Sequence, residues 1–218
     1  MTEKQGKQNQ LAGDLLKKIK ERKAMAGVIG LGYVGLPLSM ELVNAGFTVT
    51  GFDIAPQKVQ LLNSGKSDID DIRDEVVKEA VASKRFKATS DFKLIGQMDT
   101  ISICVPTPLS KTKDPDVSYI LNAINSIKPH MRKGSLVVLE STTYPGTTED
   151  LILPLLSETG MKVGVDFFLA FSPERVDPGR TDTVGDVVVE DGRIRSVGPT
   201  DAEAADRIVA EARKAVAD

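Results

Sequence analysis

Three glycines set close together constrain the fold of this chain more than any other feature. They lie where a short apolar run at residues 26–30, predicted to be a strand, meets a helical pattern at residues 34–45. Gly30 would permit the tight turn, Gly32 would leave the backbone open to a ligand, and Gly35 would let the helix pack closely on the strand. The sequence therefore predicts a strand, a tight turn and a helix that starts at a ligand-binding edge.

The alternation of apolar strand and helix continues along the chain. Strands that read as nearly continuous apolar runs are typical of parallel sheets covered on both faces. The pattern predicts a doubly wound α/β domain with a parallel sheet of the Rossmann type. Further strands are predicted at residues 47–53, 86–89, 100–105, 136–140 and 167–171, and further helices at 56–63, 71–83, 117–130 and 148–158.

A leader over residues 1–23 is predicted to precede this domain. Residues 1–10 are polar and are expected to be disordered. Apolar residues then recur at helical spacing and predict a short amphipathic helix packed on the domain. They are Leu11, Leu15, Leu16 and Ile19.

The domain itself is predicted to cover residues 24–179, and a tail of different character covers residues 180–218. Alternating residues on either side of Asp191-Gly192 predict a β-hairpin. Thr200 and Glu203 have the spacing of a capping box and predict a final helix.

The glycine turn has the G-x-G-x-x-G pattern of a dinucleotide site, in which the phosphates lie at a helix N-terminus. Asp53 ends the second predicted strand, close to the spacing of about 20 residues expected for a carboxylate that binds the ribose. A carboxylate accepts hydrogen bonds from the ribose diol and repels a 2′-phosphate, so NAD is expected rather than NADP. Asp53 could instead cap the next helix, and Lys58 could be a solvated surface lysine rather than a cofactor contact. The predicted cofactor-binding residues here are Gly30, Gly32, Tyr33, Val34, Gly35, Asp53 and Lys58.

Composition excludes several other classes of function. The net charge of −3 argues against a nucleic-acid or anionic-membrane partner. No apolar run approaches the roughly 20 residues that cross a bilayer, and the N-terminus lacks the apolar core of a signal peptide. The single cysteine, Cys104, excludes an internal disulfide and a multi-cysteine zinc site. We expect a cytoplasmic protein without a metal.

Three further segments follow predicted strands and are more specific than the glycine pattern. They read ICVPTP at residues 103–108, ESTTYPGTT at 140–148 and SPERVDPG at 172–179. Together with GLGYVGLPL at 30–38, they resemble the UDP-glucose/GDP-mannose dehydrogenase family over residues 11–179. The PERVDPG form and the leader helix are most similar to the branch that oxidises UDP-N-acetylglucosamine or UDP-N-acetylmannosamine at C6 to the uronic acid.

The resemblance implies roles for individual residues. Thr107 would lie near the cofactor ribose, and Thr143 beside the nicotinamide and the catalytic water. Glu174 would act as an acid and base in the hydrolysis step, and Arg175 and Val176 would contact the sugar nucleotide. The structural alternatives are that Thr107 caps a turn and that Glu174 only accepts backbone N–H bonds.

In this family the alcohol is oxidised twice, with two NAD, through a thiohemiacetal on a cysteine. Cys104 does not match that nucleophile, and the motifs that carry the family's catalytic cysteine and lysine are absent from these 218 residues. We therefore expect a truncated enzyme that is inactive alone. Its expected substrate is a UDP-sugar, and a complementing C-terminal half and a second copy of the chain are candidate partners.

Three alternatives stay open from the sequence. The chain could be a stand-alone NAD-binding module without chemistry. A hydroxyacid dehydrogenase fits less well, because it would not need the segments at 140–148 and 172–179. The tail could continue the family's pattern, with Val197-Gly198 as its turn, or be foreign, since its VEDGRI run resembles the opening hairpin of amidohydrolases.

Overall fold

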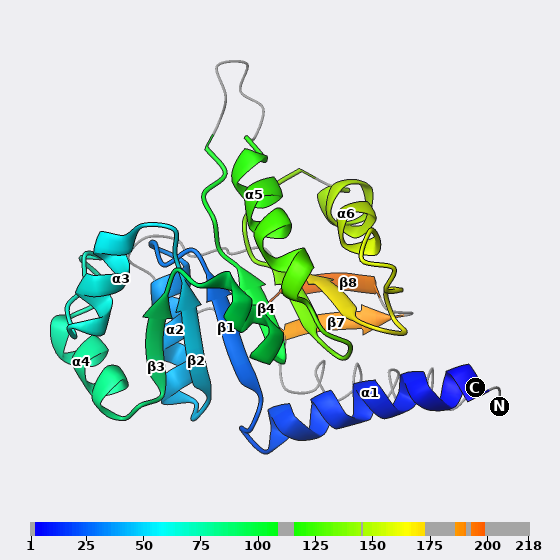
Figure 1. Cartoon of the computed structure of the whole chain (residues 1–218), viewed down its shortest axis with the longest axis horizontal. Helices are drawn as coiled ribbons and strands as arrows, with labels where there is room; N and C mark the ends of the chain where they lie inside the picture. The colour runs from blue at the N-terminus through cyan, green and yellow to red at the C-terminus, as the bar shows by residue number, and fades with distance from the viewer. Residues whose placement is uncertain (1–2, 109–115, 145, 173–185, 191–192, 199–218) are drawn as a thin grey trace.

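The computed structural model describes residues 3–108, 116–144, 146–172, 186–190 and 193–198. Its centre is a parallel sheet of six strands in the order β3-β2-β1-β4-β5-β6 (Figure 1). The strands are β1 (Met25–Ile29), β2 (Thr48–Phe52), β3 (Phe86–Thr89), β4 (Thr100–Ile103), β5 (Leu136–Leu139) and β6 (Phe168–Phe171). The predicted doubly wound sheet is confirmed.

Helices connect successive strands and cover both faces of this sheet (Figure 1). The α-helices are α1 (Glu3–Lys20), α2 (Gly35–Asn44), α3 (Pro56–Asn63), α4 (Asp74–Ala82), α5 (Ser118–Ile127) and α6 (Leu153–Ser157). The 3₁₀-helices are η1 (Phe92–Gln97) and η2 (Lys128–His130), and a π-helical segment, η3 (Thr147–Ile152), leads into α6.

The sheet separates two hydrophobic clusters, because neighbouring residues of a strand point to opposite faces. Val28 of β1 belongs to the cluster under α2 and α4, whereas Ile29 belongs to the cluster under α5 and α6. Both side chains are almost completely buried. Because helices cover both faces of the sheet, the residues that point to either face are apolar. The sequence of a strand is therefore a continuous apolar run rather than an alternation of apolar and polar residues.

The strand order places β1 at the centre, with the connections running outward in opposite directions from β1 and β4. In open α/β sheets such a reversal leaves a crevice at the carboxyl ends of the two strands, where ligands bind. The pairing of β1 with β4 runs from Ala26 opposite Thr100 to Ile29 opposite Ile103, so both strands end together at this crevice.

Two strands follow the main sheet, β7 (Asp186–Glu190) and β8 (Arg193–Gly198), and they pair antiparallel. This pairing agrees with the predicted hairpin. The turn at Asp191-Gly192 and the predicted helix from Thr200 lie outside the described residues. In the part of the chain that the structure describes, no helix is both long and apolar enough to cross a membrane.

The leader differs from its prediction. Helix α1 begins at Glu3, so the expectation of disorder over residues 1–10 is wrong for residues 3–10. Glutamate, glutamine and lysine are polar but good helix formers, and polarity alone is a poor guide to disorder. Leu15 is buried against the domain, but Leu16 is 55% exposed and does not belong to the buried face.

Two further elements were predicted incompletely. The 3₁₀-helix η1 lies in a stretch for which no element was predicted. The helix predicted at residues 148–158 is divided into η3 and α6. Pro154 stands at the first turn of α6, and because proline has no N–H to donate, it interrupts a continuous α-helical ladder.

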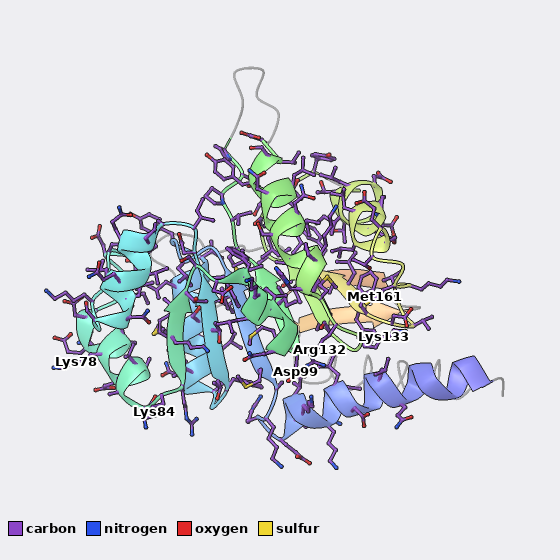
Figure 2. The ribbon with its side chains drawn as sticks, viewed as in Figure 1. Lys78, Lys84, Asp99, Arg132, Lys133 and Met161 are labelled. Atoms are coloured by element: carbon purple, nitrogen blue, oxygen red, sulfur yellow. The ribbon has the colours of Figure 1, made fainter. Side chains whose placement is uncertain are left out.

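A buried carboxylate anchors α1 to the amino-terminal edge of the sheet. Asp99, 3% exposed, directly precedes β4 and accepts hydrogen bonds from Lys18 Nζ of α1 at 2.8 Å and from the Met25 N–H at 2.9 Å. Arg132, which follows η2, also pairs with it. Figure 2 shows Asp99 and Arg132 close together near the end of α1.

The surroundings of Asp99 keep it ionised. Burial by itself raises the pKa of the Asp99 carboxyl, but the hydrogen bonds from Lys18, the Met25 N–H and Arg132 outweigh that effect and lower the pKa below its usual value. A carboxyl with a depressed pKa stabilises the fold above its unfolded pKa, and this contribution is lost as the pH falls through the lower, folded value.

We expect Asp99→Asn to lower the free energy of unfolding by about 1–3 kcal/mol at neutral pH, because the partners of a buried charge are left incompletely satisfied. The difference from wild type should begin to shrink as the pH falls below about 4, the usual pKa of an aspartate, and should disappear only below the lowered pKa of Asp99 in the folded protein, where the wild-type carboxyl is itself protonated. Urea denaturation followed by circular dichroism at several pH values measures both. A difference that is constant with pH would contradict this account of Asp99.

Candidate functional site

The glycine turn connects β1 to α2 at the central crevice, and two of its glycines are required by the backbone itself. Gly30 has φ of 86°, and a Cβ there would lie 2.7 Å from the carbonyl oxygen of Cys104. A Cβ at Gly35 would lie 1.8 Å from the carbonyl oxygen of Gly30. Any side chain at either position would separate α2 from the ends of β1 and β4.

Gly32 is different, because a Cβ built there meets nothing within 4 Å. It therefore faces open space, and the fold does not need a glycine at this point. A side chain would project into the space that a ligand on the turn would use. The three glycines thus separate into two that shape the turn and one that keeps it accessible.

Helix α2 points its amino-terminal end at this open space. Its cap residue is Val34, and no side chain caps the helix. The first N–H groups of a helix have no partner within the helix and carry partial positive charge, which makes them suitable for phosphate oxygens. Tyr33 stands beside them with 70% of its surface exposed.

Asp53, directly after β2, binds the turn from the side. Its Oδ2 accepts the N–H of Leu31 at 3.0 Å, and its Oδ1 accepts the N–H of Ala55 at 2.9 Å. Asp53 is not the cap of α3, because Ala55 occupies the cap position and no side chain caps that helix. The alternative that Asp53 serves as a helix cap is therefore wrong.

Lys58, in the first turn of α3, reaches the same residue of the glycine turn, Leu31. Its Nζ donates to the carbonyl oxygen of Leu31 at 3.2 Å and forms an ion pair with Asp68 Oδ2 at 2.6 Å. The lysine side chain is only 19% exposed. It is therefore not a solvated surface lysine, which was the sequence-based alternative.

A cavity of about 590 Å³ extends from the glycine turn across the ends of β1, β2 and β4 to α5. Its wall includes Asp53 and Lys58 on one side and Tyr119 on the other, and Ile54, 80% exposed, stands at its rim. An open glycine turn, an uncapped helix end, a carboxylate and an apolar wall are the features that a dinucleotide needs. The residues present fit such a cofactor.

The loops after β4 and β5 meet at the same edge of the sheet. Thr107 Oγ1 donates to the carbonyl oxygen of Thr142 at 2.6 Å. Ser141 is buried and donates to the carbonyl oxygens of Val105 at 2.7 Å and Ile103 at 3.2 Å. These bonds hold the ICVPTP and ESTTYPG segments side by side.

Thr143, which follows Thr142 in the same loop, is half-buried. Its hydroxyl lies 2.9 Å from the hydroxyl of Thr147, which also bonds the carbonyl oxygen of Tyr144. Thr143 and Thr107 are therefore on adjacent loops beyond the carboxyl ends of the strands. Glu174, Arg175 and Val176 lie outside the described residues, so their predicted roles stay predictions.

Cys104 is 6% exposed and follows β4 directly, rather than lying within the strand as predicted. Its side chain belongs to the hydrophobic cluster under α2. A cysteine packed among apolar side chains behaves as a small hydrophobic side chain. Among the described residues, no group of three or more His, Cys, Asp or Glu could hold a metal ion.

Sequence reasoning missed two contributors to this site. Ser141 joins the loops after β4 and β5, and Asp68 pairs with Lys58 from the loop between α3 and α4. Ser141 lies inside a motif that was recognised, so its position was a usable signal. Asp68 is one of several acidic residues in an exposed loop, and nothing in the sequence distinguishes it from its neighbours.

The model of the UDP-glucose/GDP-mannose dehydrogenase family, NAD binding domain, matches residues 24–211. This chain belongs to that family. Its cofactor is NAD, and the cavity over the glycine turn is the place in the described structure with the features to hold it.

Named relatives support the same assignment. The chain is 41% identical to the UDP-N-acetyl-D-mannosamine dehydrogenase of Pyrococcus horikoshii over 70% of its own length and 37% of the relative's. It is 37% identical to the UDP-N-acetyl-D-glucosamine 6-dehydrogenase of Salmonella typhi over 70% of this chain and 35% of that protein. The chain thus spans little more than a third of each relative.

A solved structure of the Pyrococcus horikoshii enzyme aligns with a TM-score of 0.67 over 72% of this chain and 37% of that chain, at 41% identity. An NDP-N-acetyl-D-galactosaminuronic acid dehydrogenase from Methanosarcina mazei aligns with the same TM-score of 0.67 over 75% of this chain and 37% of that one, at 36% identity. The fold and the family are therefore established independently.

We expect Gly32→Val to abolish measurable NAD binding while the melting temperature changes little, because the side chain fills ligand space and its Cβ meets no protein atom within 4 Å. Gly35→Val is the matched control and should lose much of the fold, since its Cβ would overlap the Gly30 carbonyl oxygen. Calorimetry with NAD and thermal melting distinguish the two variants. Wild-type affinity in Gly32→Val would disprove this placement of the phosphates.

Asp53 provides a second test of the cofactor. We expect NAD to bind more tightly than NADP, and Asp53→Ala to weaken NAD binding by about 1–3 kcal/mol, since a charge-assisted hydrogen bond to the ribose is lost. Calorimetry with both cofactors gives the two affinities. Equal affinity of the wild type for NADP would be incompatible with the proposed role of Asp53.

Proposed function

We propose that this chain forms the NAD-binding part of an enzyme that oxidises C6 of a UDP-N-acetylhexosamine to the uronic acid. The observation that carries the proposal is the hydrogen bond from Thr107 to the Thr142 carbonyl. It brings the loops after β4 and β5 together at the edge where the glycine turn and Asp53 already form a cofactor cavity. Thr143 would then lie beside the reacting end of the cofactor.

The residues of this chain would divide the work of binding. The turn at Gly32 and the end of α2 would hold the pyrophosphate, and Asp53 would accept the hydroxyls of the adenosine ribose. Thr107 and Thr143 would position the second ribose and the nicotinamide, which accepts hydride from the substrate when NAD is bound.

The loop after β6 would reach the substrate. Ser172 is held by its N–H, which bonds the carbonyl oxygen of Leu139 at 2.9 Å, and the SPERVDPG segment starts from this point at the same edge of the sheet. We propose Glu174 for proton transfer in the hydrolysis step and Arg175 and Val176 for contacts with the sugar nucleotide. Two relatives, a UDP-N-acetyl-D-mannosamine dehydrogenase and a UDP-N-acetyl-D-glucosamine 6-dehydrogenase, support this choice of substrate.

These 218 residues are proposed not to complete the reaction by themselves. Formation of the acid requires a nucleophile that holds the aldehyde near the cofactor. Cys104, the single thiol of the sequence, borders the cofactor cavity but is only 6% exposed, and its side chain packs in the hydrophobic cluster under α2. We propose that the nucleophile and the proton-transferring lysine come from a complementing C-terminal part, as the resemblance to the family implies.

We expect the purified chain to bind NAD and to produce no NADH with UDP-N-acetylglucosamine or UDP-N-acetylmannosamine. Addition of a C-terminal half from a full-length relative should restore NADH formation, measured by absorbance. Cys104→Ser should change neither result, because the thiol is packed in the core. Steady NADH formation by the chain alone that is lost in Cys104→Ser would show that Cys104 is the nucleophile and that this proposal is wrong. NAD binding with no NADH formation even after the C-terminal half is added would favour a stand-alone binding module.

A further inference from the structure

The ion pair between Lys58 and Asp68 affects the net charge beside the cofactor cavity. Lys58 lines the cavity and contacts the carbonyl oxygen of Leu31, while Asp53 binds the N–H of the same residue. The Lys58 ammonium group and the carboxylate that would hold the adenosine ribose therefore bind the two backbone groups of a single residue. A 2′-phosphate on that ribose carries a charge of about −1.5 to −2 and would be attracted by a free ammonium group.

Asp53 alone would thus select weakly between NAD and NADP, because Lys58 opposes its repulsion of the extra phosphate. Asp68 changes this balance. With Asp68 the three side chains carry a net charge of −1, and without it their charges cancel. Among the described residues, Asp68 is not part of the cavity wall. Its Oδ2 lies 2.6 Å from Lys58 Nζ.

We propose that Asp68 determines the preference for NAD over NADP by neutralising Lys58 and holding it on the glycine turn. The lysine then serves as a donor to the Leu31 carbonyl rather than as a phosphate ligand. Asp68 touches no cofactor in this arrangement and acts through Lys58, so it is a positioning residue. The proposal rests on the assignment of NAD to this cavity.

A purely structural role for Asp68 is less suited to the geometry. Asp68 is 39% exposed, and partly exposed ion pairs contribute little to stability. The loop that carries it has anchors of its own. Ile69 is buried in the core, and the Ser67 N–H bonds Asp74 Oδ1 at 2.8 Å. Removal of the Asp68 charge should therefore leave the loop in place.

The experiment compares Asp68→Asn with Asp70→Asn, which removes the same charge from an exposed position of the same loop. Calorimetry or displacement titration gives the dissociation constants of NAD and NADP for each protein, and thermal melting checks the fold. In Asp68→Asn we expect NADP to bind about five- to tenfold more tightly relative to NAD, with a smaller effect at high salt. In Asp70→Asn the ratio should stay within about twofold of wild type, since an exposed charge outside the ion pair is screened.

Lys58→Met provides a test of opposite sign that does not depend on the stability of Asp68→Asn. With the ammonium removed, two carboxylates remain, and NADP should bind still more weakly relative to NAD than in wild type. The double variant Lys58→Met/Asp68→Asn should lose the gain in NADP affinity. These results would support the proposal.

Other results would overturn it. An unchanged ratio of the NADP and NAD dissociation constants in Asp68→Asn, or equal shifts in Asp68→Asn and Asp70→Asn, would show that the ion pair does not govern cofactor choice. In that case NAD binding by the wild type would leave the proposed function intact. If the wild-type chain binds neither cofactor, the assignment of the cavity fails and this inference fails with it.

Discussion

The close approach of Gly35 to the carbonyl of Gly30 is the constraint on which the remaining site depends. With only 1.8 Å between a built Cβ and that oxygen, α2 can begin where it does only because residue 35 has no side chain. This approach aims the uncapped end of α2 at the crevice between β1 and β4. The expected position of the phosphates, the opening at Gly32 and the place of Asp53 beside the turn all follow from it.

The backbone of Leu31 then links the geometry of the turn to the charges around it. Its N–H is held by Asp53 and its carbonyl by Lys58, so the turn is fixed from both sides before any cofactor arrives. Because the turn is already ordered, less conformational entropy is lost when the cofactor binds. The same two bonds place one carboxylate and one ammonium beside the expected ribose, and this explains why a third group, Asp68, matters to the charge of the site.

Stability and binding are located at opposite edges of the sheet. Asp99 joins α1, β1 and the segment after η2 at the amino ends of the strands, whereas the glycine turn and the threonine loops lie at the carboxyl ends. Parallel strands impose this separation, because all their carboxyl ends meet at one edge. Loops at that edge can therefore differ in chemistry without disturbing the anchor at the other.

The sequence by itself determined the parallel sheet, the strand–turn–helix unit at Gly30–Gly35, Asp53 and the family, because apolar periodicity and glycine spacing are local signals. Only the tertiary structure decided the ion pairs of two carboxylates. Asp99 pairs with Lys18 and Arg132, and Asp68 pairs with Lys58. Asp99 is 81 residues from Lys18, and Asp68 resembles every other acid in its loop until the fold places it against α3. Contacts between distant segments depend on strand order and helix packing, and no single segment of sequence records them.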